Sequence, residues 1–193
     1  TCALPICRED MDDSSKVDAY IKNLDAQFDL VLLAEYFDQG LVLLKNLLCW
    51  SLEDMLYIKV NSRKPSLRRS LSNMTRDNVL KWNRGDYQLY THFKKRFFKT
   101  LRTHDDQIVR SEAKSILDLN HAWFDKCVGL QVGREGLAGS SQVFGDKVLG
   151  YKLKEEAERI PLCKYLTMAE IPFTELLRKK QLKRLTAQAM KQL

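Results

Sequence analysis

Residues 28–50 read FDLVLLAEYFDQGLVLLKNLLCW and join two apolar runs through a short acidic connection. The first run, Phe28–Ala34, lacks a regular alternation of apolar and polar side chains, which is typical of a short strand buried on both faces. The second run, Leu41–Trp50, is typical of a buried helix, and Asp38 stands where a helix N-cap is expected. The stretch therefore predicts a strand, a tight loop and a helix, which together form one α/β unit.

The loop between the two runs carries the first candidate binding residues. In open α/β sheets ligands bind beyond the carboxyl ends of the strands, and Glu35, Tyr36 and Asp38 occupy that position. A carboxylate there can accept hydrogen bonds from substrate hydroxyls. Capping of the helix alone accounts for Asp38, and we favour that explanation for it. Glu35 has no such structural duty, so a binding role and a plain surface role stay open for it.

The rest of the chain predicts a mainly helical protein. Residues 56–60 alternate like a half-buried strand, whereas apolar residues recur at helical spacing from Thr75 onward. Helix starts are expected at Ser14 or Ser15, at Asp86, at Asp105 or Asp106, and at a capping box that begins with Thr167. We divide this single partial domain into a lead-in (1–27), a strand–helix–strand segment (28–62), a helical segment (73–126), a glycine-rich loop (127–150) and a C-terminal segment with a basic helix (151–193). Two strands cannot complete a doubly wound sheet, so the chain predicts the C-terminal part of a larger α/β fold.

The net charge of +7 comes from two basic stretches, residues 59–110 and 178–191. A positive surface favours polyanions, but a solvated surface that keeps the protein soluble explains the charge equally well. The sequence contains no recognisable nucleic-acid-binding motif, so we expect no nucleic acid partner. The five cysteines form no pair or cluster at metal-ligand spacing, and we expect no metal site. An apolar run of about 18 residues, which a membrane-spanning helix needs, is also missing.

Four segments together carry a family resemblance. They are residues 34–50 with the following LEDMLYIKVNSR (52–63), then WNRGDYQLYTHF (82–93), VLGYKLK (148–154) and LCKYLTMAEI (162–171). In this order they resemble the galactose-3-O-sulfotransferases, and most nearly the members that act on galactosylceramide. The first match is long and specific, while the later ones are short and gain weight from their order. The resemblance runs from about residue 28 to residue 173.

The resemblance implies a fold and an activity. The fold would be the C-terminal part of a P-loop-NTPase-like sulfotransferase, mainly helical with a few parallel strands. The reaction would move a sulfuryl group from 3′-phosphoadenosine-5′-phosphosulfate to the 3-hydroxyl of galactose in a glycolipid or glycan, without a metal. The enzyme would lie on the lumenal side of the Golgi membrane, held by an N-terminal helix that this chain lacks. The alternatives are a truncated, non-catalytic family member and a basic helical interaction module.

The resemblance also suggests where a donor and a substrate would bind. Lys147, Tyr151 and Lys152 flank the glycine-rich loop, at the position where related sulfotransferases contact the donor, although the family more often has Asn at position 152. Tyr87 and His92 lie on an expected amphipathic helix and are candidate substrate contacts, but packing explains both residues better. The expected catalytic base falls outside the matched segments, so no catalytic residue is assigned.

A phosphate-binding loop is not evident in the sequence. The glycine-rich stretch 133–141 is the one candidate, and it lacks both the glycine spacing and the lysine of such a loop. In the resembling family this loop precedes the matched part. We therefore expect that the chain alone does not transfer sulfate.

The cysteines carry one further expectation. Cys127 and Cys163 both match cysteines of the resembling family, which implies a disulfide between them if the chain lies in a secretory compartment. The alternative is that both are free thiols. Cys49 is expected to be a free thiol packed within the apolar helix.

Overall fold

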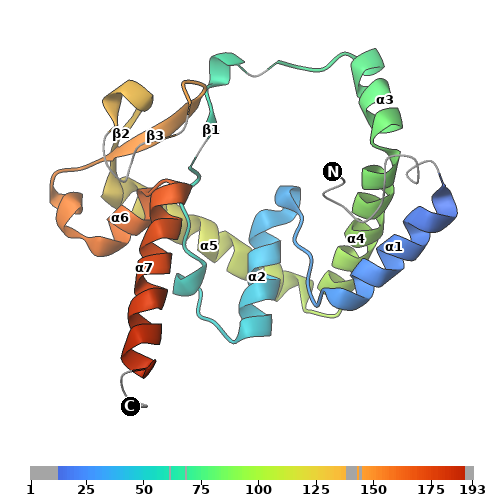
Figure 1. Cartoon of the computed structure of the whole chain (residues 1–193), viewed down its shortest axis with the longest axis horizontal. Helices are drawn as coiled ribbons and strands as arrows, with labels where there is room; N and C mark the ends of the chain where they lie inside the picture. Colours follow the sequence, from blue (N-terminus) through green and yellow to red (C-terminus); the bar gives the residue numbers. More distant parts are fainter. Residues whose placement is uncertain (1–12, 61, 68, 138–142, 144, 190–193) are drawn as a thin grey trace. The chain divides into compact units, whose positions relative to one another are not determined.

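The computed structural model describes residues 13–60, 62–67, 69–137, 143 and 145–189 (Figure 1). These residues form two compact units. The first comprises the described residues up to Met55 and Arg69–Leu117, and the second comprises Leu56–Arg68 and the chain from Asp118 onward. One helix, α5 (Asp106–Cys127), begins in the first unit and ends in the second.

The first unit is helical. Its elements are α1 (Ser14–Gln27), η2 (Ala34–Tyr36), α2 (Phe37–Leu48), η3 (Glu53–Met55), α3 (Asn73–Trp82), α4 (Arg84–Arg102) and the first half of α5. Side-chain caps set three of the helix starts. Asp13, Ser72 and Asp105 each accept hydrogen bonds from backbone N–H groups in the first turn of α1, α3 and α5. The helices expected near Ser14, Thr75 and Asp105 are confirmed.

The expected strand Phe28–Ala34 is wrong. Residues 28–33 form an extended connection without a strand partner in the described chain, and η2 follows. The reason lies in the backbone hydrogen bonds, because the Arg96 guanidinium donates to the carbonyl oxygens of Phe28 (2.6 Å) and Asp29 (3.0 Å). A side chain from α4 thus takes the place that a neighbouring strand would fill.

Helix α2 begins earlier than expected, at Phe37. Tyr36 occupies the N-cap position, so Asp38 lies inside the first turn and is not the cap. Its negative charge still complements the partial positive charge of the helix N-terminus. At the other end Cys49 has a left-handed backbone (φ 54°) and an exposed side chain, so the expectation that Cys49 packs within the helix is wrong. Helix α4 likewise begins before Asp86, with Asn83 at the cap position.

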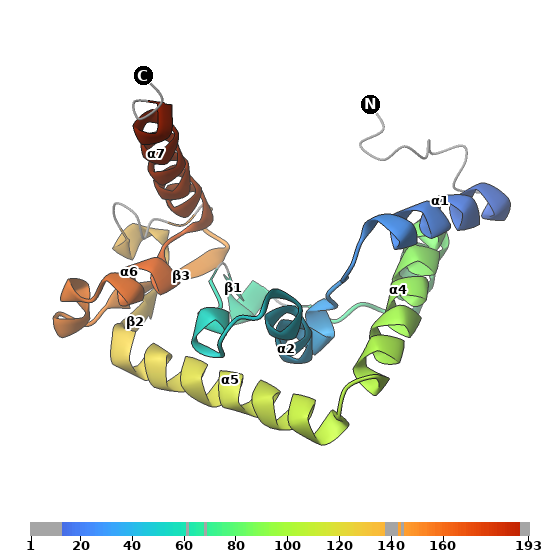
Figure 2. The same cartoon turned by 90° about the horizontal axis from the view of Figure 1, so that it is seen from below.

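The core of the first unit forms around Leu33, Leu43 and Phe97. Tyr36, Tyr90, Phe98, Leu30 and Leu101 pack against these three residues. Helix α1 lies against α4 in both views of the fold (Figures 1 and 2), where Arg96 also pairs with Asp25 at 2.7 Å. Helix α2 is tied to α5 by a mostly buried ion pair between Lys45 and Glu112 at 2.9 Å.

The second unit contains a small sheet with the strand order β1-β3-β2. Its elements are β1 (Ser62–Arg63), η4 (Pro65–Leu67), β2 (Val128–Val132), η5 (Arg134–Gly136), β3 (Val148–Leu153), η7 (Glu156–Arg159), α6 (Pro161–Thr167) and α7 (Glu170–Ala189). Both strand pairs are antiparallel, so the expected parallel strands are wrong for the described residues. Residues 128–132 and 148–150, expected in a loop, belong to strands. A P-loop-like fold stays a prediction.

The expected strand 56–60 is also wrong, for the same physical reason as the first. The Tyr57 backbone N–H donates to the Asn120 side chain (2.9 Å), and the Lys59 carbonyl accepts from the Tyr151 hydroxyl (2.7 Å). Side chains of α5 and β3 therefore satisfy backbone groups that a strand partner would otherwise use.

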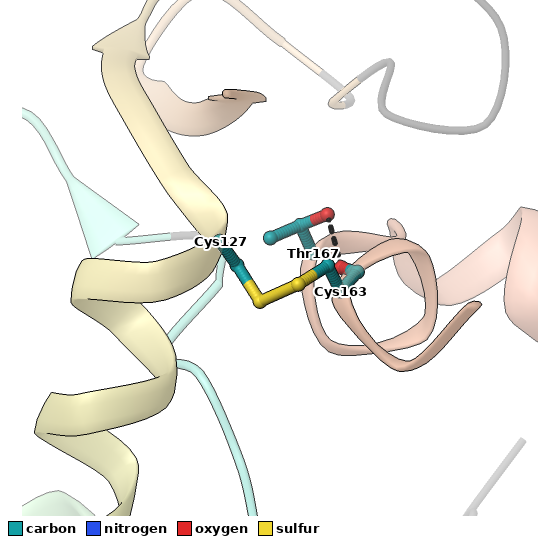
Figure 3. Close-up of a disulfide and its surroundings, with 3 residues drawn as sticks. All are labelled: Cys127, Cys163 and Thr167. Carbon is teal, nitrogen blue, oxygen red and sulfur yellow. Dashed lines mark hydrogen bonds between the residues drawn. A yellow bond between two sulfur atoms is a disulfide. The ribbon is translucent and has the colours of Figure 1, made fainter. Parts of the chain in front are cut away.

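A disulfide joins the end of α5 to α6 and completes the core of the second unit. Cys127 and Cys163 form the expected pair, with their Cα atoms 5.2 Å apart (Figure 3). Both residues are fully buried beside Ile58, Val128 and Tyr151. The Thr167 hydroxyl donates to the Cys163 carbonyl at 2.9 Å (Figure 3). Thr167 therefore closes α6 and does not cap the last helix, contrary to expectation.

Substitution of Phe97 tests the core of the first unit. Phe97→Ala is expected to lower the free energy of unfolding by about 3–5 kcal/mol, because the side chain is 2% exposed and its removal leaves a cavity. Urea unfolding measures the change. Leu47→Ala is the control, because Leu47 is 55% exposed and its loss should change stability by no more than about 0.5 kcal/mol. Equal effects of the two substitutions would contradict this core.

The disulfide has a separate test in the second unit. Its sequence separation is 36 residues, so closing that loop should stabilise the oxidised protein by about 3–4 kcal/mol relative to a Cys127→Ser, Cys163→Ser variant. Urea unfolding compares the two proteins. Peptide mapping without reduction is expected to recover residues 127 and 163 in one cross-linked fragment, and full alkylation of both thiols before reduction would disprove the bridge.

Candidate functional site

The candidate residues from the sequence divide between the two units. Those expected to contact substrate, Glu35, Tyr36, Asp38, Tyr87 and His92, all lie in the first unit. Those expected to contact the donor, Lys147, Tyr151 and Lys152, all lie in the second.

Glu35 belongs to a hydrogen-bonded chain of three side chains. The Tyr90 hydroxyl donates to Glu35 Oε1, and Lys94 Nζ donates to the Tyr90 oxygen at 3.1 Å. Lys94 Nζ also lies 4.0 Å from Glu35 Oε1. Tyr90 and Lys94 stand one turn apart on α4, so that a single helix face presents both groups to η2. The carboxylate is therefore held in a fixed place.

The hydrogen bonds among Glu35, Tyr90 and Lys94 favour the charged forms of Glu35 and Lys94. The Tyr90 hydroxyl bond holds the pKa of the Glu35 carboxyl below its ordinary value. The hydrogen bond from Lys94 to Tyr90 raises the pKa of the Lys94 ammonium. The side chains of Glu35 and Lys94 are 44% and 39% exposed, respectively. An ionised carboxylate and an ammonium are thus both within reach of a ligand in solution.

Tyr36 provides an aromatic surface beside these three hydrogen-bonded side chains. Its ring is half-buried and packs edge-on to Phe98, with ring centroids 4.9 Å apart. The Lys94 ammonium lies 5.7 Å from the centroid of the Tyr36 ring. Tyr36 and Lys94 both line a groove of about 890 Å³ between η2, α2, α4 and the start of α5. Grooves of this size commonly hold small ligands.

The other three substrate candidates do not join Glu35 and Tyr36. Asp38 is half-buried in the first turn of α2, and Tyr87 is 52% exposed at the start of α4. His92 faces α1, where its Nε2 lies 3.3 Å from Asp25 Oδ1. Burial raises the pKa of Asp25, but the close contact with His92 and the hydrogen bond from Arg96 outweigh this and bring it below its ordinary value. Binding roles for Asp38, Tyr87 and His92 stay predictions.

The donor candidates have different surroundings. Tyr151 is buried in the core of the second unit, its hydroxyl bonds the Lys59 carbonyl, and burial raises the pKa of that hydroxyl. Packing in the core accounts for Tyr151 without a contact to a donor. Lys147 and Lys152 are exposed at the start of β3 and within it. Contacts of these three residues with a donor stay predictions.

The described residues do not fit a phosphate-binding loop of the strand–loop–helix type. All described strand pairs are antiparallel, and Gly133 leads into η5, which has three residues. Such a short helix does not concentrate enough N–H groups on an anion. Residues 138–142 lie outside the described chain. No chemical step is therefore assigned to donor contacts on this loop.

Sequence reasoning missed the contacts that Tyr90, Lys94 and Arg96 make. The i, i+4 spacing of Tyr90 and Lys94 is visible in the sequence and indicates that they share a helix face. Their partner Glu35 lies 55 residues away, and the carbonyl partners of Arg96 lie 67 and 68 residues away. Spacing alone gives no signal for contacts at such separations.

No group of three or more His, Cys, Asp or Glu side chains in the described residues is arranged to hold a metal ion. Among the described helices, none combines the length and apolar character needed to cross a membrane.

Comparison with known proteins gives a consistent result. A family model described as Galactose-3-O-sulfotransferase matches residues 6–181. Galactosylceramide sulfotransferase of Mus musculus is 35% identical over 169 residues, which cover 83% of this chain and 40% of that protein. Galactose-3-O-sulfotransferase 3 of Mus musculus is 29% identical over 188 residues, covering 92% and 44%. The chain thus spans less than half the length of these relatives. No solved structure matches it.

The Tyr90 hydroxyl has a direct electrostatic test. Tyr90→Phe is expected to raise the pKa of Glu35 toward its ordinary value, because the hydrogen bond that favours the carboxylate is lost. At pH values above the ordinary carboxyl pKa, this hydrogen bond contributes fully to the stability of the folded protein. The contribution is lost as the pH falls through the lowered pKa. NMR titration of the Glu35 carboxyl carbon measures the shift. Tyr87→Phe, on the exposed part of the same helix, should leave it unchanged, and an unchanged pKa in Tyr90→Phe would refute the bond.

Proposed function

The chain belongs to the galactose-3-O-sulfotransferase family, and from that membership we propose that the protein transfers a sulfuryl group to the 3-hydroxyl of galactose. The observation that carries the proposal is the family match, which extends over residues 6–181. The acceptor we propose is galactosylceramide or a related galactose-terminated glycolipid or glycan. The names and identities of the similar proteins support this choice.

The proposed donor is 3′-phosphoadenosine-5′-phosphosulfate, which family membership supports. We place its phosphate-binding loop outside the described residues, because those residues do not fit one. The proposed location is the lumenal side of the Golgi membrane. The Cys127–Cys163 disulfide supports an oxidising compartment of this kind, since structural disulfides rarely persist in a reducing cytosol.

Glu35 and Tyr36 would serve the acceptor. The Glu35 carboxylate can accept hydrogen bonds from sugar hydroxyls, and the Tyr36 ring offers an apolar face to a sugar ring. Because the Tyr90 hydrogen bond favours the ionised form of Glu35, we propose that this carboxylate orients the sugar by accepting hydrogen bonds. The Tyr90 hydroxyl, with the Lys94 ammonium nearby, favours the ionised carboxylate and holds it in place.

The reaction also requires a base and cationic groups that are not assigned to residues of this chain. The galactose 3-oxygen attacks sulfur, the bond from sulfur to the leaving phosphate oxygen breaks, and a base takes the hydroxyl proton. Cations stabilise the negative charge that spreads over the transferred group. A non-catalytic role is the second candidate for the chain by itself, because a donor loop is not found among its described residues.

A chimera tests the proposed function. Replacing the matching region of mouse galactosylceramide sulfotransferase with residues 6–181 should give an enzyme that sulfates β-galactosides. In that chimera Glu35→Ala should lower kcat/KM by roughly 10–100-fold, the expected loss for a charged hydrogen bond. Sulfate transfer to galactosylceramide and to a lactose-type acceptor is measured with labelled donor.

Asp38→Asn is the matched control for the chimera. Asn keeps the size of the side chain and Asp38 is not the helix cap, so activity should fall far less than in Glu35→Ala. A folded chimera that transfers no sulfate would contradict the proposed function. Full activity of Glu35→Ala would remove Glu35 from the site and leave the function intact.

A further inference from the structure

The groove of the first unit has an apolar floor and a basic rim. Its charged lining residues are Lys94, Lys95, Arg102, Arg110 and Asp106. The apolar surface comes from Tyr36 and Phe98, whose rings meet edge to face, and from the aliphatic side chains of Leu101 and Val109. All these residues belong to the first unit.

The four cations of the groove differ in what they contact. Arg110 pairs with Asp106 at 2.7 Å, and Lys94 is held by Tyr90 and Glu35. Within the described chain the Lys95 ammonium has no hydrogen-bond or ion-pair partner. Arg102 donates through Nε to the Phe98 carbonyl at 3.2 Å, which leaves its terminal nitrogens available.

The two available cations lie on one side of the groove. Lys95 and Arg102 are about two helical turns apart on α4, so they project from nearly the same face. Phe98 lies between them in sequence and lines the same groove. The one lining carboxylate, Asp106, already pairs with Arg110. An uncompensated positive strip therefore borders an aromatic surface.

From this arrangement we propose that the groove binds a sulfate or phosphate monoester carried by a ring-bearing molecule. Lys95 and Arg102 contact the oxyanion, and the ring of the ligand lies against Tyr36 and Phe98. Guanidinium and ammonium groups are the usual partners of such oxyanions, and aromatic faces suit sugar and base rings alike. The proposal concerns binding alone, and its choice of ligands rests on the proposed function, whose two products are molecules of this kind.

Two chemical sources can supply this ligand, a sulfated sugar and a nucleotide. The binding experiment separates them. Isothermal titration of the full 193-residue chain uses a β-galactoside 3-sulfate, adenosine 3′,5′-bisphosphate, inorganic sulfate and the uncharged β-galactoside. At least one of the two ring-bearing anions should bind more tightly than inorganic sulfate and than the uncharged sugar. Its affinity should fall as salt is added, because exposed charges are screened.

The matched variants are on the same helix. The double variant Lys95→Gln, Arg102→Gln should weaken binding of that anion by roughly tenfold or more. Lys99→Gln removes one positive charge from an exposed position of α4 that does not line this groove, and it should change affinity by less than about twofold. Circular dichroism confirms that each variant remains folded. NMR shifts of the Tyr36 and Phe98 ring protons should follow the same titration.

Three outcomes would overturn the proposal. They are failure of both ring-bearing anions to bind at millimolar concentration, equal loss of affinity in Lys99→Gln and in the double variant, and ring-proton shifts that do not respond to ligand. Stronger binding of the galactoside sulfate or of the nucleotide identifies the source. An inactive chimera would leave the result of this experiment unchanged.

Discussion

The arrangement of the first unit depends on the Arg96 guanidinium. It donates to the carbonyl and carboxylate of Asp25 at 2.8 and 2.7 Å, and to the carbonyls of Phe28 and Asp29 at 2.6 and 3.0 Å. The rigid planar fork of arginine suits this set of acceptors, whereas a lysine ammonium would not hold them in the same way. These bonds join the end of α1 and the start of the connection to α4. Leu33 then reaches the core beside Phe97, and Glu35 meets Tyr90. The geometry of the candidate site follows from that anchor.

In the second unit, too, side chains bind backbone groups that lack a strand partner, but other residues provide them. Buried backbone groups need partners, and in 56–60 the partners are the side chains of Asn120 and Tyr151. The disulfide then fixes the end of α5 to α6 within the core that contains Tyr151. A small antiparallel sheet suffices because the core rests on these links and on the burial of Cys127, Cys163 and Ala157. In both units, side chains complete what a larger sheet would otherwise supply.

The correct structural predictions came from local signals in the sequence. Apolar spacing predicted the amphipathic helices, and the acidic pair at 105–106 predicted the start of α5, because caps and periodicity act within a few residues. The strand expected at 28–34 failed because an apolar run has the same pattern whether a strand or a distant arginine satisfies its carbonyls. Glu35 and Tyr36 were selected because they follow a strand that does not form, yet Tyr36 lines the groove and Glu35 contacts Tyr90 and Lys94 beside it. Their partners on α4 come from contacts that only the folded chain brings together.

We infer that Arg96 places Tyr36 and Glu35 against α4. The most direct test is the nuclear Overhauser effect between the ring protons of Tyr36 and Phe98, compared in the wild type and in Arg96→Gln. The ring centroids lie 4.9 Å apart, so the wild type should give a strong cross-peak. Loss of the guanidinium should weaken or abolish that cross-peak while the helical content of the protein persists. A cross-peak that is missing in the wild type, or one that keeps its full intensity in Arg96→Gln, would contradict the claim.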